Sequence, residues 1–438
     1  MKHFCFVLAA MLTLTLAGSA QTADPAKILQ VTGERLLADL KRMPRYTCVQ
    51  TITRTYYETR HHSDRPSCST LIAEHDTRKK KLPVEGWDRL RLEVALVEGG
   101  SVYSWVGAPR FTDDTLDKLA GSGPLGSGDF GVFLNGILRH ATLNFQGERV
   151  VDGARLFEYS YEMPISKSGY RVKVPDGWRV TGYGGTLLLD PQANDLVQLV
   201  VRTDELPSAS SACQATSEVS YQRAPIHERM VLVPHETKLF TISTTGNESI
   251  SETSYANCRE YTSTVKMIFG GETISASPGP NAVSTPAQET AVPLPAGLRF
   301  NAHITTPLDI NTAAAGDPIE AVLSTPMRDK NKTAIASVGT RLHGRLRIFK
   351  VSTGAFIILE VGLEFESIEI EGRNVPLKAA FPPSHAIFIP GNYYRRFLRP
   401  DYSFVGGIFF FNNIHLRPKQ LDSEWITVTP GEEKDNKK

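Results

Sequence analysis

The 438-residue sequence lacks a surplus of charge of either sign. It contains 48 lysines and arginines against 47 aspartates and glutamates, a formal net charge of +1. Proteins that hold nucleic acid through its phosphates carry a clear basic excess, so we expect no nucleic-acid partner. The densest basic run, Arg78 to Lys81, is typical of a solvated loop.

Long apolar runs are missing beyond the amino-terminal segment. There, Lys2 and His3 precede an apolar core from Phe4 to Ala17, and small residues follow at positions 18–20, which predicts a signal peptide over residues 1–20. The core is shorter than the ~20 apolar residues of a membrane-spanning helix. Cleavage would leave 438 − 20 = 418 residues without a transmembrane span, in the periplasm or outside the cell.

Cysteine is scarce. Cys5 falls within the signal, which leaves Cys48, Cys68, Cys213 and Cys258. An even number in an oxidising compartment predicts two disulfides, and four cysteines allow three pairings. We favour Cys48 with Cys68 and Cys213 with Cys258, because the members of each pair lie near one another along the chain.

A metal site is the alternative for the segment around Cys68, where His61, His62 and His75 lie close in sequence. These residues match no recognised zinc-ligand spacing, and an oxidising compartment favours disulfides. We therefore expect neither a metal nor a cofactor.

Catalytic motifs are absent from the sequence. No serine stands in a G-x-S-x-G elbow, and four bridged cysteines leave no thiol nucleophile. Two overlapping G-x-G-x-x-G strings over residues 121–131 follow the polar stretch TDDTLDKLA instead of a strand, which favours a flexible loop over a nucleotide site. His140, His235, Asp190 and Asp195 are scattered. We expect no enzyme.

The residues that are present favour a chain made mainly of β-strands. Asp24 and Pro25 are typical of a helix start, and apolar spacing predicts a helix over 24–42, with a second, short helix over 129–139. Leu90 to Leu96 alternate with polar residues, as in a half-buried strand. Turn residues between such segments indicate antiparallel connections. The further strands expected in this half span residues 46–59, 171–174, 178–183, 187–189, 196–201, 218–222, 230–233, 238–244 and 261–269.

Residues 270–296 are rich in Pro, Ser and Thr and have no apolar period, which predicts a linker between domains at 21–269 and 297–429. In the second domain, alternation changes parity near Ser367, which predicts a β-bulge there. The polar tail, residues 430–438, is predicted to be disordered.

The amino-terminal half resembles the half-barrel family of outer-membrane lipoprotein carriers and localisation factors, which also includes periplasmic sensors. The stretches that carry the resemblance are LLADLKRM, YTCVQTITRTYYE, RLRLEVALVE and WRVTGYGGTLLLDPQANDLVQLVV. The resemblance implies a mainly β (α+β) fold, with an antiparallel half-barrel sheet closed by one long helix. It also implies that a concave, apolar sheet face holds a lipid, an amphiphile or a lipoprotein.

The carboxyl-terminal half is similar to the periplasmic β-barrel of the type IV secretion core-complex protein that forms the outer ring. The matching residues are Thr306-Pro307-Leu308-Asp309, Ala315-Gly316-Asp317-Pro318, Val338-Gly339-Thr340-Arg341-Leu342 and Gly344-Arg345-Leu346. The glycines among them are typical of turns and of close backbone approach. This resemblance implies a smaller barrel that docks to a partner in the cell envelope.

One aromatic and basic cluster stands out in that half: Tyr393, Tyr394, Arg395, Arg396 and Phe397. Such a cluster is typical of a solvated loop between strands. Because arginine and tyrosine are enriched at protein interfaces, a partner-docking loop is the alternative.

Two functions remain open from the sequence. The favoured one is a non-enzymatic, extracytoplasmic binding protein, a carrier or sensor of a lipid, an amphiphile or a lipoprotein. The alternative is an envelope assembly or scaffold component that docks through the second domain. A large apolar groove on the inner sheet face favours the first function, whereas a groove filled by its own side chains favours the second.

Overall fold

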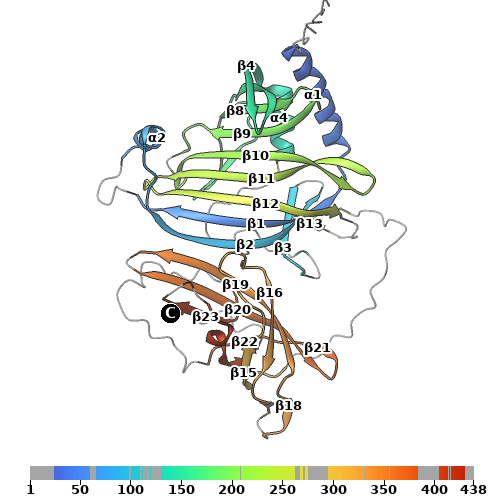
Figure 1. Ribbon diagram of the computed structural model, residues 1–438, viewed down its shortest axis with the longest axis vertical. Coiled ribbons are helices and arrows are strands. Elements are labelled where there is room, and N and C mark those ends of the chain that lie inside the picture. Colours follow the sequence, from blue (N-terminus) through green and yellow to red (C-terminus); the bar gives the residue numbers. More distant parts are fainter. Residues whose placement is uncertain are drawn as a thin grey trace, which may run out of the picture.

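The computed structural model describes residues 24–59, 66–97, 100–108, 111, 119, 130–207, 209–261, 267–269, 272–274, 294–329, 331–354, 356–382, 404–412, 414 and 416–429 (Figure 1). The predicted signal peptide at 1–20, the glycine strings up to residue 129, the cluster Tyr393 to Phe397 and the tail at 430–438 lie outside the described residues.

The N-terminal body, residues 24–261, is built on one strongly curved antiparallel sheet. Its strands pair in the order β4, β5, β8, β9, β10, β11, β12, β1, β2, β3. Their bounds are β1 Tyr46–Tyr57, β2 Val84–Val97, β3 Gly100–Trp105, β4 Thr142–Val151, β5 Ala154–Met163, β8 Tyr183–Asp190, β9 Asp195–Thr203, β10 Ala212–Ile226, β11 Arg229–Ser243 and β12 Glu248–Glu260. A separate hairpin joins β6 (Arg171–Val174) to β7 (Gly177–Val180), and a second joins β13 (Met267–Phe269) to β14 (Glu272–Ile274).

The helices of this body whose bounds the structure describes are α1 (Pro25–Lys41), α2 (Cys68–Thr77) and α4 (Phe130–His140). The Asp24 carboxylate accepts a hydrogen bond from the Ala26 N–H at 3.0 Å and caps α1, and Pro25 occupies its first turn. The predicted helices at 24–42 and 129–139 are thus confirmed. Helix α2 was not predicted, because Leu71 is its one buried residue and gives no apolar period.

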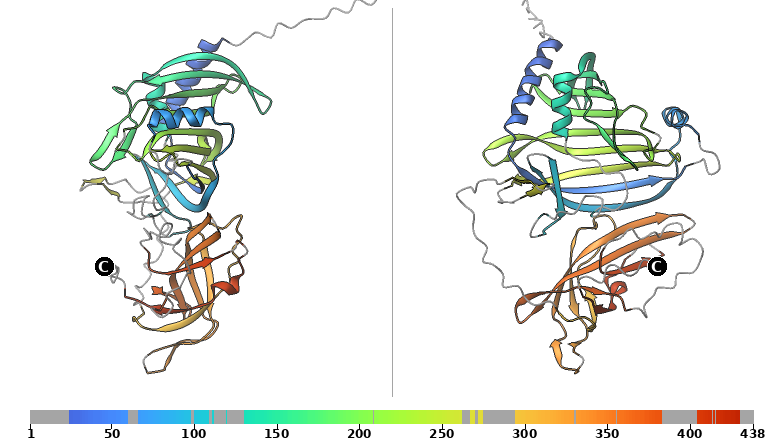
Figure 2. Two further views of the ribbon diagram at one scale, coloured as in Figure 1. Left: turned by 90° about the vertical axis from the view of Figure 1, so that its left-hand side faces the viewer. Right: turned by 180° about the vertical axis from the view of Figure 1, so that it is seen from behind.

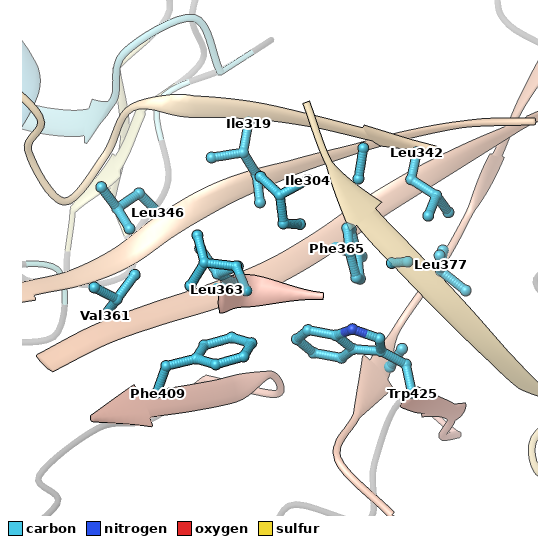
Figure 3. Packing of buried hydrophobic residues seen from close by; sticks show 14 of the residues in the cluster. Ile304, Ile319, Leu342, Leu346, Val361, Leu363, Phe365, Leu377, Phe409 and Trp425 are labelled. Atoms are coloured by element: carbon cyan, nitrogen blue, oxygen red, sulfur yellow. The ribbon is translucent and has the colours of Figure 1, made fainter. Parts of the chain in front are cut away.

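The C-terminal body, residues 294–429, wraps antiparallel strands around one apolar core (Figure 3). Its strands pair in the order β22, β24, β15, β16, β19, β20, and both β21 and β23 pair with β20. Their bounds are β15 Arg299–Ile304, β16 Pro318–Leu323, β17 Met327–Arg328, β18 Ala334–Ala336, β19 Arg341–Thr353, β20 Ile357–Ile370, β21 Arg373–Pro376, β22 Ala379–Ala380, β23 Gly407–Phe411 and β24 Ser423–Thr427, with a 3-10 helix η2 at Pro418–Leu421. The mainly β, antiparallel fold class is confirmed in both bodies.

The β-bulge predicted near Ser367 is also confirmed. Opposite β19, the register shifts so that His343 faces Ser367 while Gly344 faces Phe365. The extra residue lets both Phe365 and Ile368 point into the core, where each is 0% exposed. Gly344 permits the predicted close approach, because a Cβ at this position would lie 2.3 Å from the carbonyl oxygen of Glu364.

The pairing we favoured for the disulfides is wrong. Cys48 bonds to Cys258 and Cys68 bonds to Cys213. The favoured pairs assumed that cysteines close in sequence are close in space. Instead, β1 pairs with β12 and so brings Cys48 to the end of a strand 210 residues later, while Cys68 begins α2, which packs on β10. The metal alternative at Cys68 is excluded by its disulfide.

The two bodies meet along the free edge of β2 (Figures 1 and 2). Residues 350–352 of β19 pair antiparallel with residues 86–88 of β2. Ala315 exchanges backbone hydrogen bonds with Arg89 and Arg91, at 2.8 and 2.6 Å. Gly316, at φ +108°, approaches so closely that a Cβ would lie 2.0 Å from the Arg91 carbonyl oxygen. The division at residues 270–296 stays a prediction, since most of that segment lies outside the described residues.

Candidate ligand-binding cavity

The inner face of the N-terminal sheet is the face that α1 and α4 cover (Figure 1). Directly paired residues share a face of a sheet, so the strand registers define rows of side chains across it. One row, from β5 to β2, is Tyr159, Leu187, Leu199, Val219, Thr237, Thr253, Ile52 and Leu90. The next row is Tyr161, Gly185, Val201, Ser217, Leu239, Ser251, Arg54 and Asp88.

The half of this face formed by β5, β8, β9 and β10 is apolar. Leu187, Leu199 and Val219 are each 0% exposed. They pack in one cluster with Leu36 of α1 and Ile137 of α4. This part of the sheet therefore has the apolar inner face that the resemblance implied, and the helices cover it.

A strip across the inner face of β11, β12 and β1 carries buried polar groups, which corrects the expectation of an apolar face throughout. The Gln50 Nε2, Ser251 Oγ and Thr253 Oγ1 atoms are buried and have no hydrogen-bond partner among the described residues. Arg54 donates two hydrogen bonds of 2.7 Å to the Asp88 carboxylate. An acyl chain laid here would seal polar groups from water without partners, at a cost of about 1–3 kcal/mol per group.

A cavity of about 940 Å³ opens beside the apolar half. It is enclosed by the end of α1 and the turn into β1, by α4, and by the β10–β11 hairpin. Its apolar lining comprises Leu36, Leu37, Leu40, Met43, Leu96, Leu134, Met230, Val231 and Leu232. Volumes of ~300–1,000 Å³ with a mainly apolar lining are typical of sites for small organic ligands.

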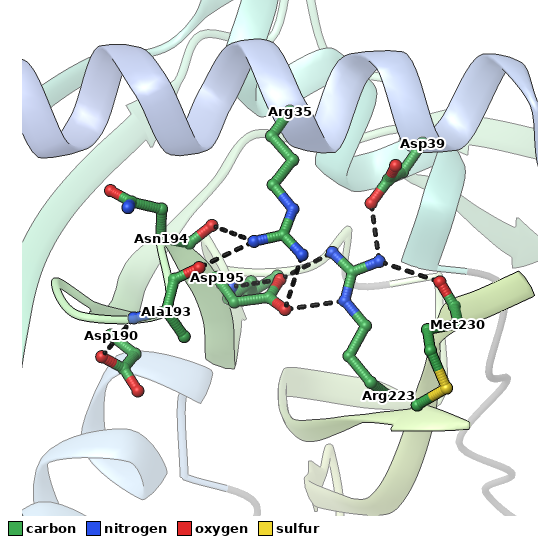
Figure 4. A network of polar contacts seen from close by, with 9 residues as sticks. Arg35, Asp39, Asp190, Ala193, Asn194, Asp195, Arg223 and Met230 are labelled. Atoms are coloured by element: carbon green, nitrogen blue, oxygen red, sulfur yellow. Dashed lines mark hydrogen bonds and ion pairs between the residues drawn. The ribbon is translucent and has the colours of Figure 1, made fainter. Parts of the chain in front are cut away.

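An ion-pair network fixes α1 over this cavity (Figure 4). The Arg223 guanidinium lies 2.7 Å from the Asp39 carboxylate and donates hydrogen bonds of 2.7 and 3.0 Å to Asp195. The hydrogen bond to Asp195 raises the pKa of Arg223 above its ordinary value. Arg35 donates to the Ala193 carbonyl at 2.7 Å. Asp39 is the one carboxylate among the described residues that line the cavity, and Arg223 neutralises it.

The lining also contains one buried polar group without a partner. The Tyr221 hydroxyl is buried and makes no hydrogen bond to any described residue. Burial raises the pKa of Tyr221 far above its ordinary value, so the hydroxyl stays protonated at neutral pH.

Few of the residues noted in the sequence meet at this site. Asp195 holds Arg223 and Arg35, whereas Asp190 accepts backbone hydrogen bonds in the turn before β9. His140 and His235 are not among the residues that line the cavity. Among the described residues, no group of three or more His, Cys, Asp and Glu side chains is placed to hold a metal ion. Nor does any described helix have the length and apolar character needed to cross a bilayer.

The cavity itself was not predicted. The apolar spacing that predicts the helix at 24–42 includes Leu36, Leu37 and Leu40, and it does not indicate that they border a cavity. Arg139 and Arg229 lie 90 residues apart and reach the same cavity through α4 and β11. Nothing in their sequence surroundings indicates that they are neighbours.

Comparisons with known proteins return distant structural likenesses. No protein-family model matches the chain, and no curated protein is found as a relative. A putative outer membrane lipoprotein-sorting protein domain from Vibrio parahaemolyticus is 10% identical, covers 55% of this chain and 94% of its own, and has a TM-score of 0.26. A LolA superfamily protein from Nitrosomonas europaea is 8% identical over 52% of this chain and 93% of its own, with a TM-score of 0.24.

A DUF1329 family protein from Desulfovibrio piger ATCC 29098 is 10% identical over 54% of this chain and 93% of its own, with a TM-score of 0.23. The proteins from Vibrio parahaemolyticus and Nitrosomonas europaea are named for the lipoprotein-carrier class that the amino-terminal half resembles. All three TM-scores are low, so these likenesses support no conclusion about function. The type IV secretion resemblance of the carboxyl-terminal half stays a prediction.

Proposed function

We propose that the chain is a non-enzymatic, extracytoplasmic protein that binds an amphiphile in the cavity of its N-terminal body, as a carrier or sensor. The observation that carries this proposal is the cavity of about 940 Å³ between α1, α4 and the β10–β11 hairpin. Its lining joins apolar side chains to charged ones, as an amphiphile requires.

The place of the cavity supports an amphiphile over a polar solute. The apolar half of the inner face continues from the cavity through Leu36 and Leu134, which belong to the same core cluster as Leu199. The exposed residues Lys41, Arg42, Arg139 and Arg229 give the cavity a polar border toward solvent. A ligand with an apolar tail and a polar head matches both surroundings.

The residues of the cavity support binding over catalysis. Among the described residues that line it, none is a histidine, cysteine, serine or threonine, and the carboxylate of Asp39 is paired with Arg223. The four cysteines outside the predicted signal all form disulfides. These bridges support an oxidising, extracytoplasmic location. The signal peptide at residues 1–20 remains part of the proposal.

Filling the cavity tests the proposal. Leu40 is partly buried on α1 and lines the cavity, so Leu40→Trp should occupy it and weaken the binding of dodecyl maltoside, a non-ionic amphiphile, by about tenfold or more. Val31 lies on the same helix, is 41% exposed and does not line the cavity, so Val31→Trp is the matched control and should bind as the unmodified protein does.

Binding is measured by isothermal titration below the critical micelle concentration, with circular dichroism to check that each variant is folded. Equal affinity in the unmodified protein and in both tryptophan variants would place the ligand elsewhere. If the unmodified protein binds no amphiphile, the carrier or sensor function is wrong, and the envelope scaffold becomes the better proposal.

A further inference from the structure

The cavity has an excess of positive charge that binding an uncharged amphiphile does not require. Lys41, Arg42, Arg45, Arg139 and Arg229 all line it, whereas Asp39 is the one carboxylate among the described residues that line it. Asp39 already lies 2.7 Å from the Arg223 guanidinium. The uncompensated charge at the cavity is therefore positive.

Four of these cations are available to a ligand. Lys41, Arg42, Arg139 and Arg229 are exposed, and within the described part of the chain none of them has a carboxylate at ion-pair distance. Arg139 donates at 2.7 Å to Asn135, a neutral side chain on its own helix. Because they line the cavity and also reach solvent, these four residues mark its mouth.

A structural role explains only part of this set. Lys41 and Arg139 lie in the last turns of α1 and α4, where a cation stabilises the negative end of a helix without any ligand. Arg42 follows the end of α1, and Arg229 begins β11. Arg42 is the C-cap residue of α1, so the helix end favours a cation there as well, and Arg229 is the residue whose placement at the mouth lacks a local explanation.

We propose that the ligand of this cavity is a lipid with an anionic head group, held at the mouth by Arg42 and Arg229 together with Lys41 and Arg139. The inference rests on the proposed function and deepens it. The acyl chain lies against Leu36, Leu40, Leu134 and Leu232. Guanidinium groups suit a phosphate or carboxylate head group, since their N–H donors match the geometry of its oxygens.

The test compares two lipids with the same acyl chain, lysophosphatidylglycerol, which is anionic, and lysophosphatidylcholine, which is zwitterionic. The full-length protein should bind the anionic lipid about tenfold more tightly or better, and rising salt should weaken that binding selectively. Arg42→Gln combined with Arg229→Gln should weaken the binding of lysophosphatidylglycerol more than that of lysophosphatidylcholine and so remove the preference. Lys79→Gln with Lys80→Gln, which removes the same charge from the exposed basic run, should keep the preference.

Equal affinity for the two lipids in the unmodified protein would overturn the anionic head group and leave the proposed function intact. Binding of neither lipid would overturn both. Glycerol 3-phosphate tests a free phosphate as the source of the anion. If it binds as tightly as lysophosphatidylglycerol, the site recognises phosphate alone and the lipid assignment is wrong. A preference that survives in the Arg42 and Arg229 double variant would overturn the role of these two residues.

Discussion

The two bodies of this protein treat their interiors differently. In the C-terminal body, Phe365, Phe381 and Phe409 surround Trp425 with ring centroids 4.8 to 6.5 Å away, inside one continuous core (Figure 3). The N-terminal body divides its buried apolar residues among three clusters, carries a polar strip on its inner face and borders a cavity. The C-terminal sheet wraps around a core formed by its own side chains. The N-terminal sheet is open, and α1 and α4 cover only the apolar part of its inner face.

Alkaline pH should destabilise the two bodies to the most different extents, because the described buried tyrosines all lie in the N-terminal body. Burial raises the pKa of eight tyrosines of the N-terminal body above the ordinary value of 10, most strongly in four of them, and the described residues of the C-terminal body contain no tyrosine. These four are Tyr56, Tyr161, Tyr221 and Tyr255. Their hydroxyls stay protonated in the folded state above pH 10, where those of the unfolded chain ionise.

The stability that this protonation contributes is fully present below pH 10 and is lost as pH rises toward the folded-state pKa values. Each tyrosine should remove about 1.4 kcal/mol per pH unit, so the four together remove roughly 5 kcal/mol by pH 11. Tyrosinate absorbance and circular dichroism, followed together during an alkaline titration, should change in one cooperative step above pH 10. Ionisation of all tyrosines at their ordinary pKa with the fold intact would contradict the buried assignment.

Removing the central aromatic residue of the C-terminal core should have the next largest effect. Trp425 is 0% exposed, so Trp425→Ala should lower the free energy of unfolding by about 3–5 kcal/mol. Trp178, on the exposed hairpin of the N-terminal body, is 60% exposed, and Trp178→Ala should change stability by about 0.5 kcal/mol or less. Urea unfolding measures both. Amphiphile affinity should be unchanged in folded Trp425→Ala, since the cavity lies in the other body.

The elements that could be predicted from the sequence are those whose buried residues are apolar and regularly spaced. Helix α1 shows its cap at Asp24 and its apolar stripe, and the bulge at Ser367 follows from a change in parity between Phe365 and Ile368. Strand β12 was missed because four of its five buried positions are polar, which leaves little apolar period; they are Glu248, Ser249, Ser251, Thr253 and Tyr255. Strand β4 was missed because it is largely exposed.

Long-range neighbours could not be predicted from the sequence. The disulfides depend on which strands pair. Strand β1 pairs with β12, and this places Cys48 beside Cys258, 210 residues later in the chain. The cavity depends on the same information, since Arg42, Arg139 and Arg229 come together through α1, α4 and β11. The resemblance to half-barrel proteins implies that a ligand lies against the sheet. It does not imply that a polar strip crosses the inner face.

The smallest predicted effect tests that division within a single row of the sheet. Val219 and Thr253 occupy the same row of the sheet. Val219 lies on its apolar part and is 0% exposed, and Thr253 lies in the polar strip and is 2% exposed. Valine and threonine have nearly the same shape, so exchanging them changes polarity with little change in packing. Val219→Thr places a hydroxyl among Leu199 and Ile137 and should lower the free energy of unfolding by about 1–3 kcal/mol.

Thr253→Val removes a buried hydroxyl that has no hydrogen-bond partner among the described residues. It should therefore leave the free energy of unfolding unchanged or raise it by about 1 kcal/mol, because the folded protein no longer carries the cost of an unpaired polar group. Urea unfolding of both variants under one set of conditions gives the sign of each change. If Thr253→Val instead destabilises the protein as much as Val219→Thr does, a water molecule or a ligand satisfies the Thr253 hydroxyl. The polar strip on the inner face would then be a hydrated extension of the binding site.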